Sequence, residues 1–221
     1  MTKLTGQQIA DQGLAGWVYL GDALYTRIAT GSFTAGLQLV NAVGLAAEEA
    51  NHHPDVDLRY PHVDIRLTTH DAGGVTDRDI ALARTVTDLA EAAGAALDGT
   101  GLSRVLITLD TPAHDGILPF WREFLAYEPP AGSENGPWRG TVLGDPTGRN
   151  PRLWFQESGA SEPRQRWHLD VWVDPSQVRS RLDAAVAAGG RVVDAGEAPA
   201  YWVLADAEGN RSCLCTWQSR D

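Results

Sequence analysis

The sequence predicts an α+β protein of two domains, and three observations support this prediction. The chain has 221 residues, which suits one large domain or two small ones, and a turn-forming stretch at 98–103 divides it near its middle. In the first segment, short strand-like runs are followed by two long helical patterns. In the second, a strand, a helix and further strands occur twice, which indicates a duplicated module.

Composition and charge narrow the classes of partner. Hydrophobic residues make up 43% of the chain, enough for packed cores, and the formal net charge is −11 with no Lys/Arg run. Nucleic acid and anionic membrane surfaces are therefore not expected partners, whereas a small molecule or a protein is. Cys213 and Cys215 would form a strained bridge, so we expect them to be reduced, as in a cytoplasm. The first residues lack the apolar run of a signal peptide, and no run approaches the roughly 20 residues of a membrane span.

Strand and helix signals define the first segment. Residues 17–20 and 23–28 read as strands, and Ser32 can cap a helix that runs to about Asn51. Its expected buried stripe is Leu37, Val40, Gly44 and Leu45. Residues 63–67 alternate as a half-buried strand.

A second helix follows that strand. Thr76 to Asp79 resembles a capping box in which Asp stands at the usual Glu position. The expected apolar face of this helix is Leu82, Val86, Leu89, Ala93 and Leu97.

The second segment divides into two similar parts. In the first, a strand at 105–110 precedes a helix through Phe120 and Phe124, and a strand follows at 152–156. In the second, a strand at 167–173 precedes a helix at 175–188. The expected strands after that helix are 191–194, 201–204 and 212–217.

The polar residues at the end of the first helix form the most unusual pattern. Glu48 and His52 are four residues apart and share a helix face, and we expect Glu48 to point inward at the end of the apolar stripe. Pro54 disfavours helix at His53, so the two adjacent imidazoles should leave the helix in different directions.

Two more residues occupy element ends, where sites are often built. His70 ends the strand at 63–67, and Asp79 begins the next helix. His62 should be about 26 Å from His70 along that strand and is excluded from the site. Each residue also has an ordinary reading: Asp79 as a cap, Glu48 as a solvated charge, His70 as a turn residue. The His-His pair could equally be surface polar residues or zinc ligands.

Taken together, the spacing resembles the signature of the pterin-4a-carbinolamine dehydratases. Glu48 is followed after three residues by His52-His53-Pro54, after five more by Tyr60, after nine by His70 and after eight by Asp79. Gly16-Trp17 and Thr69-His70 are also similar to that family, and the resemblance covers about residues 3–97.

The resemblance implies a small antiparallel sheet with helices on one face, and self-association as dimers or tetramers. It implies a dehydratase that removes water from 4a-hydroxytetrahydropterin to give quinonoid dihydropterin in tetrahydrobiopterin recycling, with no metal or organic cofactor. By resemblance, His52 and His70 are the acid/base pair, Glu48 orients His52, and Asp79 orients or polarises a histidine. The implied catalytic residues are His52, His53, His70, Glu48 and Asp79, and the implied substrate-binding residues are His53, Pro54 and Tyr60.

The second segment resembles the glyoxalase-like branch of the vicinal-oxygen-chelate superfamily. The resemblance rests on residues 167–175, 181–191 and 204–215. It implies paired βαβββ modules that form a curved sheet around a cavity. The four metal positions of that superfamily fall at Arg104, Gln156, His168 and Cys213, and a cation at the first position argues against a metal. Trp154, Trp172 and Trp202 could line a pocket for an unidentified small ligand, or could be core residues.

The sequence thus predicts a dehydratase domain at 1–98 and a glyoxalase-like domain at 103–221, in a cytoplasmic homo-oligomer. Two other readings stay open. The first domain could be a non-catalytic dimerisation or regulatory module. The second domain could be the working enzyme, metal-dependent and of glyoxalase or dioxygenase type.

Overall fold

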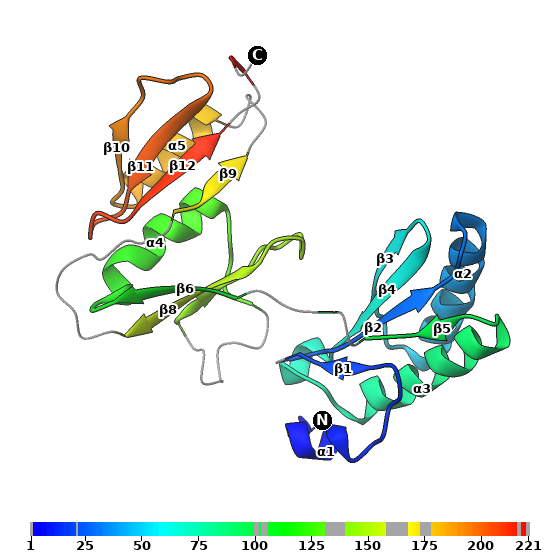
Figure 1. The fold of residues 1–221 in the computed structure, drawn as a ribbon. Coiled ribbons are helices and arrows are strands. Elements are labelled where there is room, and N and C mark those ends of the chain that lie inside the picture. The colour runs from blue at the N-terminus through cyan, green and yellow to red at the C-terminus, as the bar shows by residue number, and fades with distance from the viewer. Residues whose placement is uncertain are drawn as a thin grey trace. The chain divides into compact units, whose positions relative to one another are not determined.

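The computed structural model of the chain describes residues 2–20, 22–99, 102, 106–130, 140–157, 168–172, 178–215 and 218–219. These residues form two compact units, Met1–Arg104 and Val105–Asp221 (Figure 1). The α+β fold class predicted from the sequence is confirmed in both units. Within the described residues, no helix is long and apolar enough to cross a membrane.

The first unit is an antiparallel sheet covered on one face by two helices. The path of the sheet is β1-β2-β4-β3, and β5 pairs with β2. Its elements are α1 (Gly6–Ala10), β1 (Val18–Tyr19), β2 (Leu24–Ala29), α2 (Phe33–Ala50), β3 (Asp55–Arg59), β4 (His62–Leu67), the 3-10 turn η1 (His70–Ala72), α3 (Asp77–Ala92) and β5 (Ala96–Leu97).

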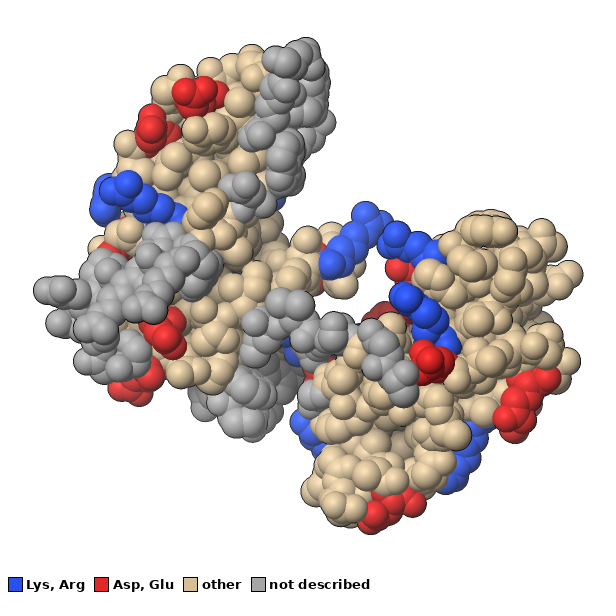
Figure 2. Space-filling model, viewed as in Figure 1, with Lys and Arg blue, Asp and Glu red and all other residues tan. Residues whose placement is uncertain are grey.

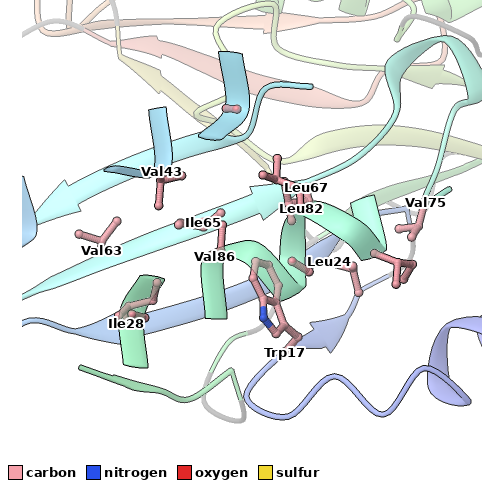
Figure 3. Close-up of a cluster of buried hydrophobic side chains, with 14 of the residues drawn as sticks. Trp17, Leu24, Ile28, Val43, Val63, Ile65, Leu67, Val75, Leu82 and Val86 are labelled. Atoms are coloured by element: carbon pink, nitrogen blue, oxygen red, sulfur yellow. The ribbon is translucent and has the colours of Figure 1, made fainter. Parts of the chain in front are cut away.

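The core of this unit lies between the sheet and the two long helices (Figure 3). Alternation along β4 places Val63, Ile65 and Leu67 in the core and leaves the residues between them half-buried. Helix α3 contributes Leu82 and Val86 to the same core, as its apolar stripe predicts. The sheet therefore has one apolar face beneath the helices and one polar face.

The predicted apolar stripe of α2 is wrong by one position. The buried residues are Gly36, Leu39, Val43 and Ala47. Gly36 lies so close to β3 that a Cβ there would come within 2.6 Å of the Leu58 side chain, so the packing requires glycine. Of the stripe expected in the core, Leu37 is 46% and Leu45 75% exposed, and Val40 is half-buried against the edge of the core. Helix α2 carries apolar residues on two neighbouring faces, and periodicity alone cannot say which of them faces the core.

Strand β3 and the short β5 complete the first unit and were not predicted. The alternating charges of Asp55–Arg59 conceal a strand that is exposed along most of its length. Leu97 lies in β5 and not in the preceding helix, because α3 ends at Ala92 and a left-handed Gly94 turns the chain back to β2.

The second unit contains two similar modules. In the first, β6 (Leu106–Thr111) precedes α4 (His114–Leu125), and β7 (Val142–Leu143) and β8 (Arg152–Glu157) follow. In the second, β9 (Asp170–Trp172) precedes α5 (Val178–Ala187), and β10 (Arg191–Asp194), β11 (Tyr201–Ala205) and β12 (Arg211–Cys215) follow. In each module the strand before the helix pairs in parallel with the last strand, β6 with β8 and β9 with β12, so the predicted duplication is present.

Aromatic side chains of α4 hold this unit together. Phe120, Trp121 and Phe124 are fully buried and contact one another, with Phe120 and Phe124 stacked at 5.4 Å between ring centroids. They pack with Leu153 and Phe155 of β8 and with Leu204 and Leu214 of the second module.

Candidate active site

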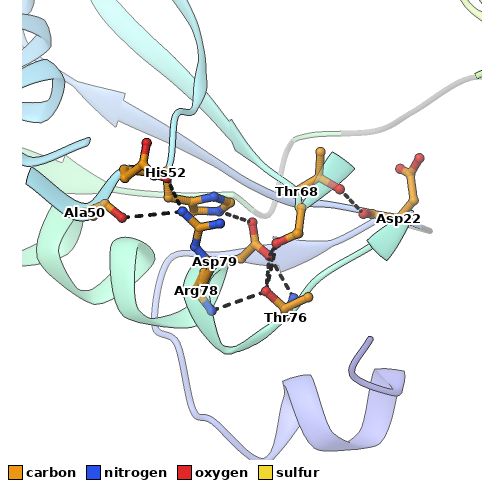
Figure 4. A network of polar contacts seen from close by, with 9 residues as sticks. Asp22, Ala50, His52, Thr68, Thr76, Arg78 and Asp79 are labelled. Atoms are coloured by element: carbon orange, nitrogen blue, oxygen red, sulfur yellow. Dashed lines mark hydrogen bonds and ion pairs between the residues drawn. The ribbon is translucent and has the colours of Figure 1, made fainter. Parts of the chain in front are cut away.

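The end of α2 positions the paired histidines. Asn51 takes the left-handed conformation, with φ 45° and ψ 43°, and the His52 backbone N–H donates to the Ala47 carbonyl at 3.0 Å. This closure ends the helix and fixes the direction of the chain at His52. The Arg78 guanidinium, from the first turn of α3, donates to the Asn51 carbonyl and more distantly to that of Ala50 (Figure 4).

His52 is paired with Asp79 inside the first unit. Its Nε2 lies 2.7 Å from Asp79 Oδ1, and Asp79 has no exposed surface while His52 is 7% exposed. The pair joins the end of α2 to the beginning of α3, as the close-up shows (Figure 4). Burial at this distance makes a strong, directional contact, because water does not compete for either group.

The other Asp79 oxygen accepts hydrogen bonds from two threonines. Oδ2 accepts from the Thr69 hydroxyl at 2.7 Å and from the Thr76 backbone N–H at 2.7 Å, with the Thr76 hydroxyl at 3.2 Å. The predicted capping box at the start of α3 is confirmed, with Asp79 in its third position. Asp79 is therefore both the cap and the partner of a histidine, two roles that the sequence presents as alternatives.

This arrangement leaves one nitrogen of His52 available. When Asp79 is ionised it can only accept, so Nε2 of His52 carries the proton of the 2.7 Å contact. Nδ1 of His52 has no hydrogen-bond partner among the described residues. Every wholly buried side-chain nitrogen or oxygen of those residues has such a partner, so Nδ1 is not wholly buried. Nδ1 therefore reaches the surface and can accept a proton there.

His70 lies on the segment that contacts the same carboxylate. It follows Thr69 directly, begins η1 and is exposed. The left-handed Gly73 ends η1, and a bridge between Thr69 and Gly74 closes the loop. Asp79 thus connects the segments of His52 and His70, one through each oxygen.

Glu48 and His53 form a separate, exposed pair. His53 Nε2 lies 3.0 Å from Glu48 Oε1, and the Glu48 side chain is 78% exposed. The expectation that Glu48 points inward and orients His52 is wrong, because the face of α2 that carries Glu48 is turned to solvent. Asp79 occupies the position next to His52 that was assigned to Glu48.

The two remaining predicted residues, Pro54 and Tyr60, lie at opposite ends of β3. Pro54 lies directly before β3 and is half-buried, next to the histidines in sequence. Tyr60 follows β3, is 72% exposed, and lies at the end of the hairpin where Arg59 pairs with His62. The structure therefore does not bring Tyr60 to the histidines of the same copy. His62 lies at the same far end, as expected, where it pairs with Asp64 at 3.8 Å.

The sequence motif does not identify Thr69 and Arg78 as parts of this site. The available signal for Thr69 was its place at the end of β4, where alternation turns the side chain toward the helices. No local signal could pair Arg78 with carbonyls 27 residues earlier.

In the second unit, the structure places three of the four metal positions predicted by resemblance. Gln156 and His168 are exposed and Cys213 is half-buried, while Arg104 lies outside the described residues. Neither Cys213 nor Cys215 forms a disulfide bond. Within the described residues, no three His, Cys, Asp or Glu side chains lie close enough to share a metal ion.

The three tryptophans considered for a pocket differ from one another. Trp202 packs against the buried core of the unit, which supports the core reading for that residue. Trp154 alternates with the core residues Leu153 and Phe155 and so lies on the opposite face of β8. The side chain of Trp172 lies outside the described part of the chain.

Comparisons with known proteins agree with this division. Residues 2–89 match the family model described as pterin 4 alpha carbinolamine dehydratase, and residues 106–215 match that of a glyoxalase-like domain. A protein of Thermomicrobium roseum, whose name assigns it provisionally to the pterin-4-alpha-carbinolamine dehydratases, is 47% identical over 92 residues, which are 41% of this chain and 99% of that protein.

Two solved structures are also similar. One is a transcriptional coactivator/pterin dehydratase of Brucella melitensis, 29% identical, with a TM-score of 0.39 over 40% of this chain and 99% of that one. The other is the fosfomycin resistance protein FosX of Listeria monocytogenes, 15% identical, with a TM-score of 0.40 over 52% of this chain and 90% of that one. On the strength of the family model and the Thermomicrobium relative, the chain belongs through residues 2–89 to the pterin-4a-carbinolamine dehydratase family, and it carries a glyoxalase-like domain after them.

Proposed function

We propose that the first unit removes water from a 4a-hydroxytetrahydropterin to give the quinonoid dihydropterin, as a step of tetrahydrobiopterin recycling. The observation that carries the proposal is the buried contact of 2.7 Å between His52 and Asp79, with His70 exposed on the segment that shares the carboxylate. Family membership supports the same reaction class.

The reaction needs one proton donor and one proton acceptor. The bond from C4a to the hydroxyl breaks as that oxygen takes a proton and leaves as water, while N5 loses its proton and a C4a=N5 double bond forms. His52 is the base at Nδ1, because Asp79 stabilises the imidazolium that results. His70 is the acid, because its exposed ring can exchange protons with solvent between turnovers.

The test is a dehydration assay on freshly generated carbinolamine with the full chain. His70→Ala should lower kcat by roughly 10²–10⁴, the usual contribution of one acid/base group. His62→Ala is the matched control, since His62 lies at the far end of β4 and should leave turnover unchanged. Undiminished turnover in His70→Ala contradicts the assignment.

A non-catalytic role for the first unit is the second candidate. The outward face of α2 favours it, because a docking module needs an exposed apolar surface. The His52–Asp79 pair argues for catalysis, since a module that only binds a partner has no use for a buried histidine with an accessible Nδ1. Absence of dehydration by the unaltered chain would favour the docking role.

We also propose that the chain forms a homo-oligomer through the outward face of α2. Phe33 and Leu37 are half or nearly half exposed, and the exposed Gly44 and Leu45 continue this apolar surface along the helix. Two copies of this stripe can pack antiparallel, which brings the acidic end of each helix at Glu48 to the N-terminus of the other.

Leu37→Glu should reduce the oligomer, as measured by light scattering after size exclusion. Gln38→Glu adds the same charge at an exposed position off the stripe and should leave the mass unchanged. An unchanged mass for Leu37→Glu would place the interface elsewhere.

For the second unit we propose a small-ligand site on the face of β8 that carries Trp154. We place this site in a domain of residues 103–221, which follows a dehydratase domain of residues 1–98. Thr108 and Val142 pair with Trp154 across the sheet and extend that face. Trp154→Phe should change the intrinsic fluorescence response to a bound ligand in a small-molecule screen. The metal-dependent alternative predicts stoichiometric metal in the purified protein.

A further inference from the structure

We propose that Thr69 is a positioning residue of the dehydratase site, and that its hydroxyl sets the ring state of His52 through Asp79. This inference rests on the proposed function of the first unit. Thr69 does not contact His52; both contact the Asp79 carboxylate, one at each oxygen.

The hydroxyl protons around Asp79 can be counted. Thr69 and Thr76 each have one hydroxyl proton, so only two of the three oxygen–oxygen contacts here can be hydrogen bonds at one time. The three are Thr69 to Asp79 at 2.7 Å, Thr69 to Thr76 at 2.8 Å and Thr76 to Asp79 at 3.2 Å. The two shortest are satisfied when Thr76 donates to Thr69 and Thr69 donates to Asp79. Thr76 Oγ1 then remains free to accept the Arg78 backbone N–H at 3.3 Å, which completes the cap of α3.

The chain of donors runs in one direction, from the first turn of α3 through Thr76 and Thr69 to Oδ2. Because each hydroxyl donates once and accepts once, the bonds polarise one another. The carboxylate receives the Thr69 proton and the Thr76 N–H on the same oxygen. Oδ1 is left for His52 alone, in an orientation fixed by the other oxygen.

The consequence concerns which nitrogen of His52 is the base. A fixed, ionised Asp79 holds the proton on Nε2 and leaves Nδ1 unprotonated at the surface. Without the Thr69 hydroxyl, Oδ2 loses its shortest side-chain donor and is held by Thr76 alone, so the carboxylate is less firmly oriented and the preference for one tautomer weakens. Thr69 also directly precedes His70, and its backbone bridge to Gly74 closes the loop that carries the second histidine.

The experiment compares Thr69→Val, Thr69→Ser and Thr68→Val in the full chain. Thr68 is the matched control: it is buried to the same degree as Thr69, and its hydroxyl donates to the Asp22 carbonyl at 2.8 Å, away from Asp79. Two readouts are taken: kcat and KM for carbinolamine dehydration, and the ring-nitrogen NMR signals of His52, assigned by their loss in His52→Asn.

Thr69→Val should lower kcat about tenfold, which corresponds to about 1.4 kcal/mol, with little change in KM. It should also convert a single Nε2–H tautomer of His52 into a mixture. Thr69→Ser should restore both, and Thr68→Val should change neither, although it also removes a buried threonine hydroxyl and its hydrogen bond.

A single Nε2–H tautomer in Thr69→Val would overturn the proposal, whatever the rate does. If the unaltered chain dehydrates no carbinolamine, the proposed function fails, and the NMR signals alone then decide whether Thr69 positions the His52 ring.

Discussion

The two units each contain a buried carboxylate with no exposed surface, Asp79 in the first and Asp206 in the second. Asp206 accepts from the backbone N–H groups of Glu208 and Asn210, from the Asn210 side chain and from the Trp121 indole, all between 2.8 and 3.2 Å. Asp79 also accepts from the backbone, but one of its oxygens contacts His52.

The difference lies in the partners and not in the burial. No partner of Asp206 can gain or lose a proton near neutral pH, so this carboxylate holds the turn between β11 and β12 against α4. Asp79 holds a helix start in the same way, and in addition fixes a group that can transfer protons. Burial of an acid by itself therefore does not identify a site, whereas a titratable partner with an accessible second nitrogen does.

Replacing Asp79 should have the largest effect on activity. Asp79→Asn keeps the size of the side chain, but its amide can donate to His52 and so select the other tautomer. We expect kcat to fall by roughly 10²–10⁴, as for loss of a histidine-orienting carboxylate. The assay is carbinolamine dehydration, normalised to folded protein by circular dichroism. An active Asp79→Asn protein would leave Asp79 with a purely structural role.

The equivalent change in the second unit should affect stability alone. In Asp206→Asn the side chain loses its charge. An amide NH2 group, which can only donate, replaces one of the two oxygens, each of which accepts two hydrogen bonds. It should destabilise the second unit by about 1–3 kcal/mol. Urea unfolding followed by tryptophan fluorescence measures this, because Trp121 is a partner of Asp206. Dehydration should continue at the rate of the unaltered chain; a parallel loss would mean that the two units are energetically coupled.

A half-buried counterpart of Asp206 lies in the first module, at Asp145. Burial by itself would raise the pKa of this carboxyl, but hydrogen bonds from Thr147 and Asn150 outweigh burial and lower the pKa to about 2. A group whose pKa is lower in the folded state stabilises the fold above its unfolded pKa of about 4 and loses this contribution as the pH falls toward 2.

Stability of the second unit should therefore decrease between about pH 4 and pH 2, and Asp145→Asn should flatten this dependence. Thermal unfolding across that pH range is the measurement, with Asp183→Asn, an exposed helix carboxyl, as the control. An unchanged slope in Asp145→Asn would assign the acid sensitivity to other carboxyls.

Glu48 should show the smallest effect. The side chains of Glu48 and His53 are both exposed, and such ion pairs contribute about 0–1 kcal/mol to the free energy of unfolding. Glu48→Gln should leave the free energy of unfolding within that range and should not alter the NMR signals of His52. A large change in the His52 signals would restore the expectation that Glu48 orients that ring.

Local patterns predicted most of the elements, because caps, alternation and turns are local. Ser32 and Thr76 cap their helices as predicted, and the strands of both modules lie close to their expected positions. The inward face of α2 could not be predicted, since two of its faces are apolar and only the packing against Leu58 and the sheet selects one. Strand β3 was hidden because its side chains are charged and its pairing with β4 is tertiary.

The site was predicted as a set of residues but not as a set of contacts. His52, His70 and Asp79 stand out by spacing, and the structure joins them through one carboxylate. Which acid meets which histidine depends on how α2 and α3 cross, so the sequence could not separate Glu48 from Asp79. For Thr69, alternation along β4 indicates an inward side chain, but its partner Asp79 is ten residues away on another element, so the contact itself could not be predicted.

The end of the first unit is anchored. Strand β5 pairs with β2, and the Asp98 backbone N–H donates to the Arg27 carbonyl at 2.8 Å. Strand β6 of the second unit begins at Leu106. Among the described residues, every sheet is built from strands of one unit, so neither unit needs a strand of the other to complete its sheet.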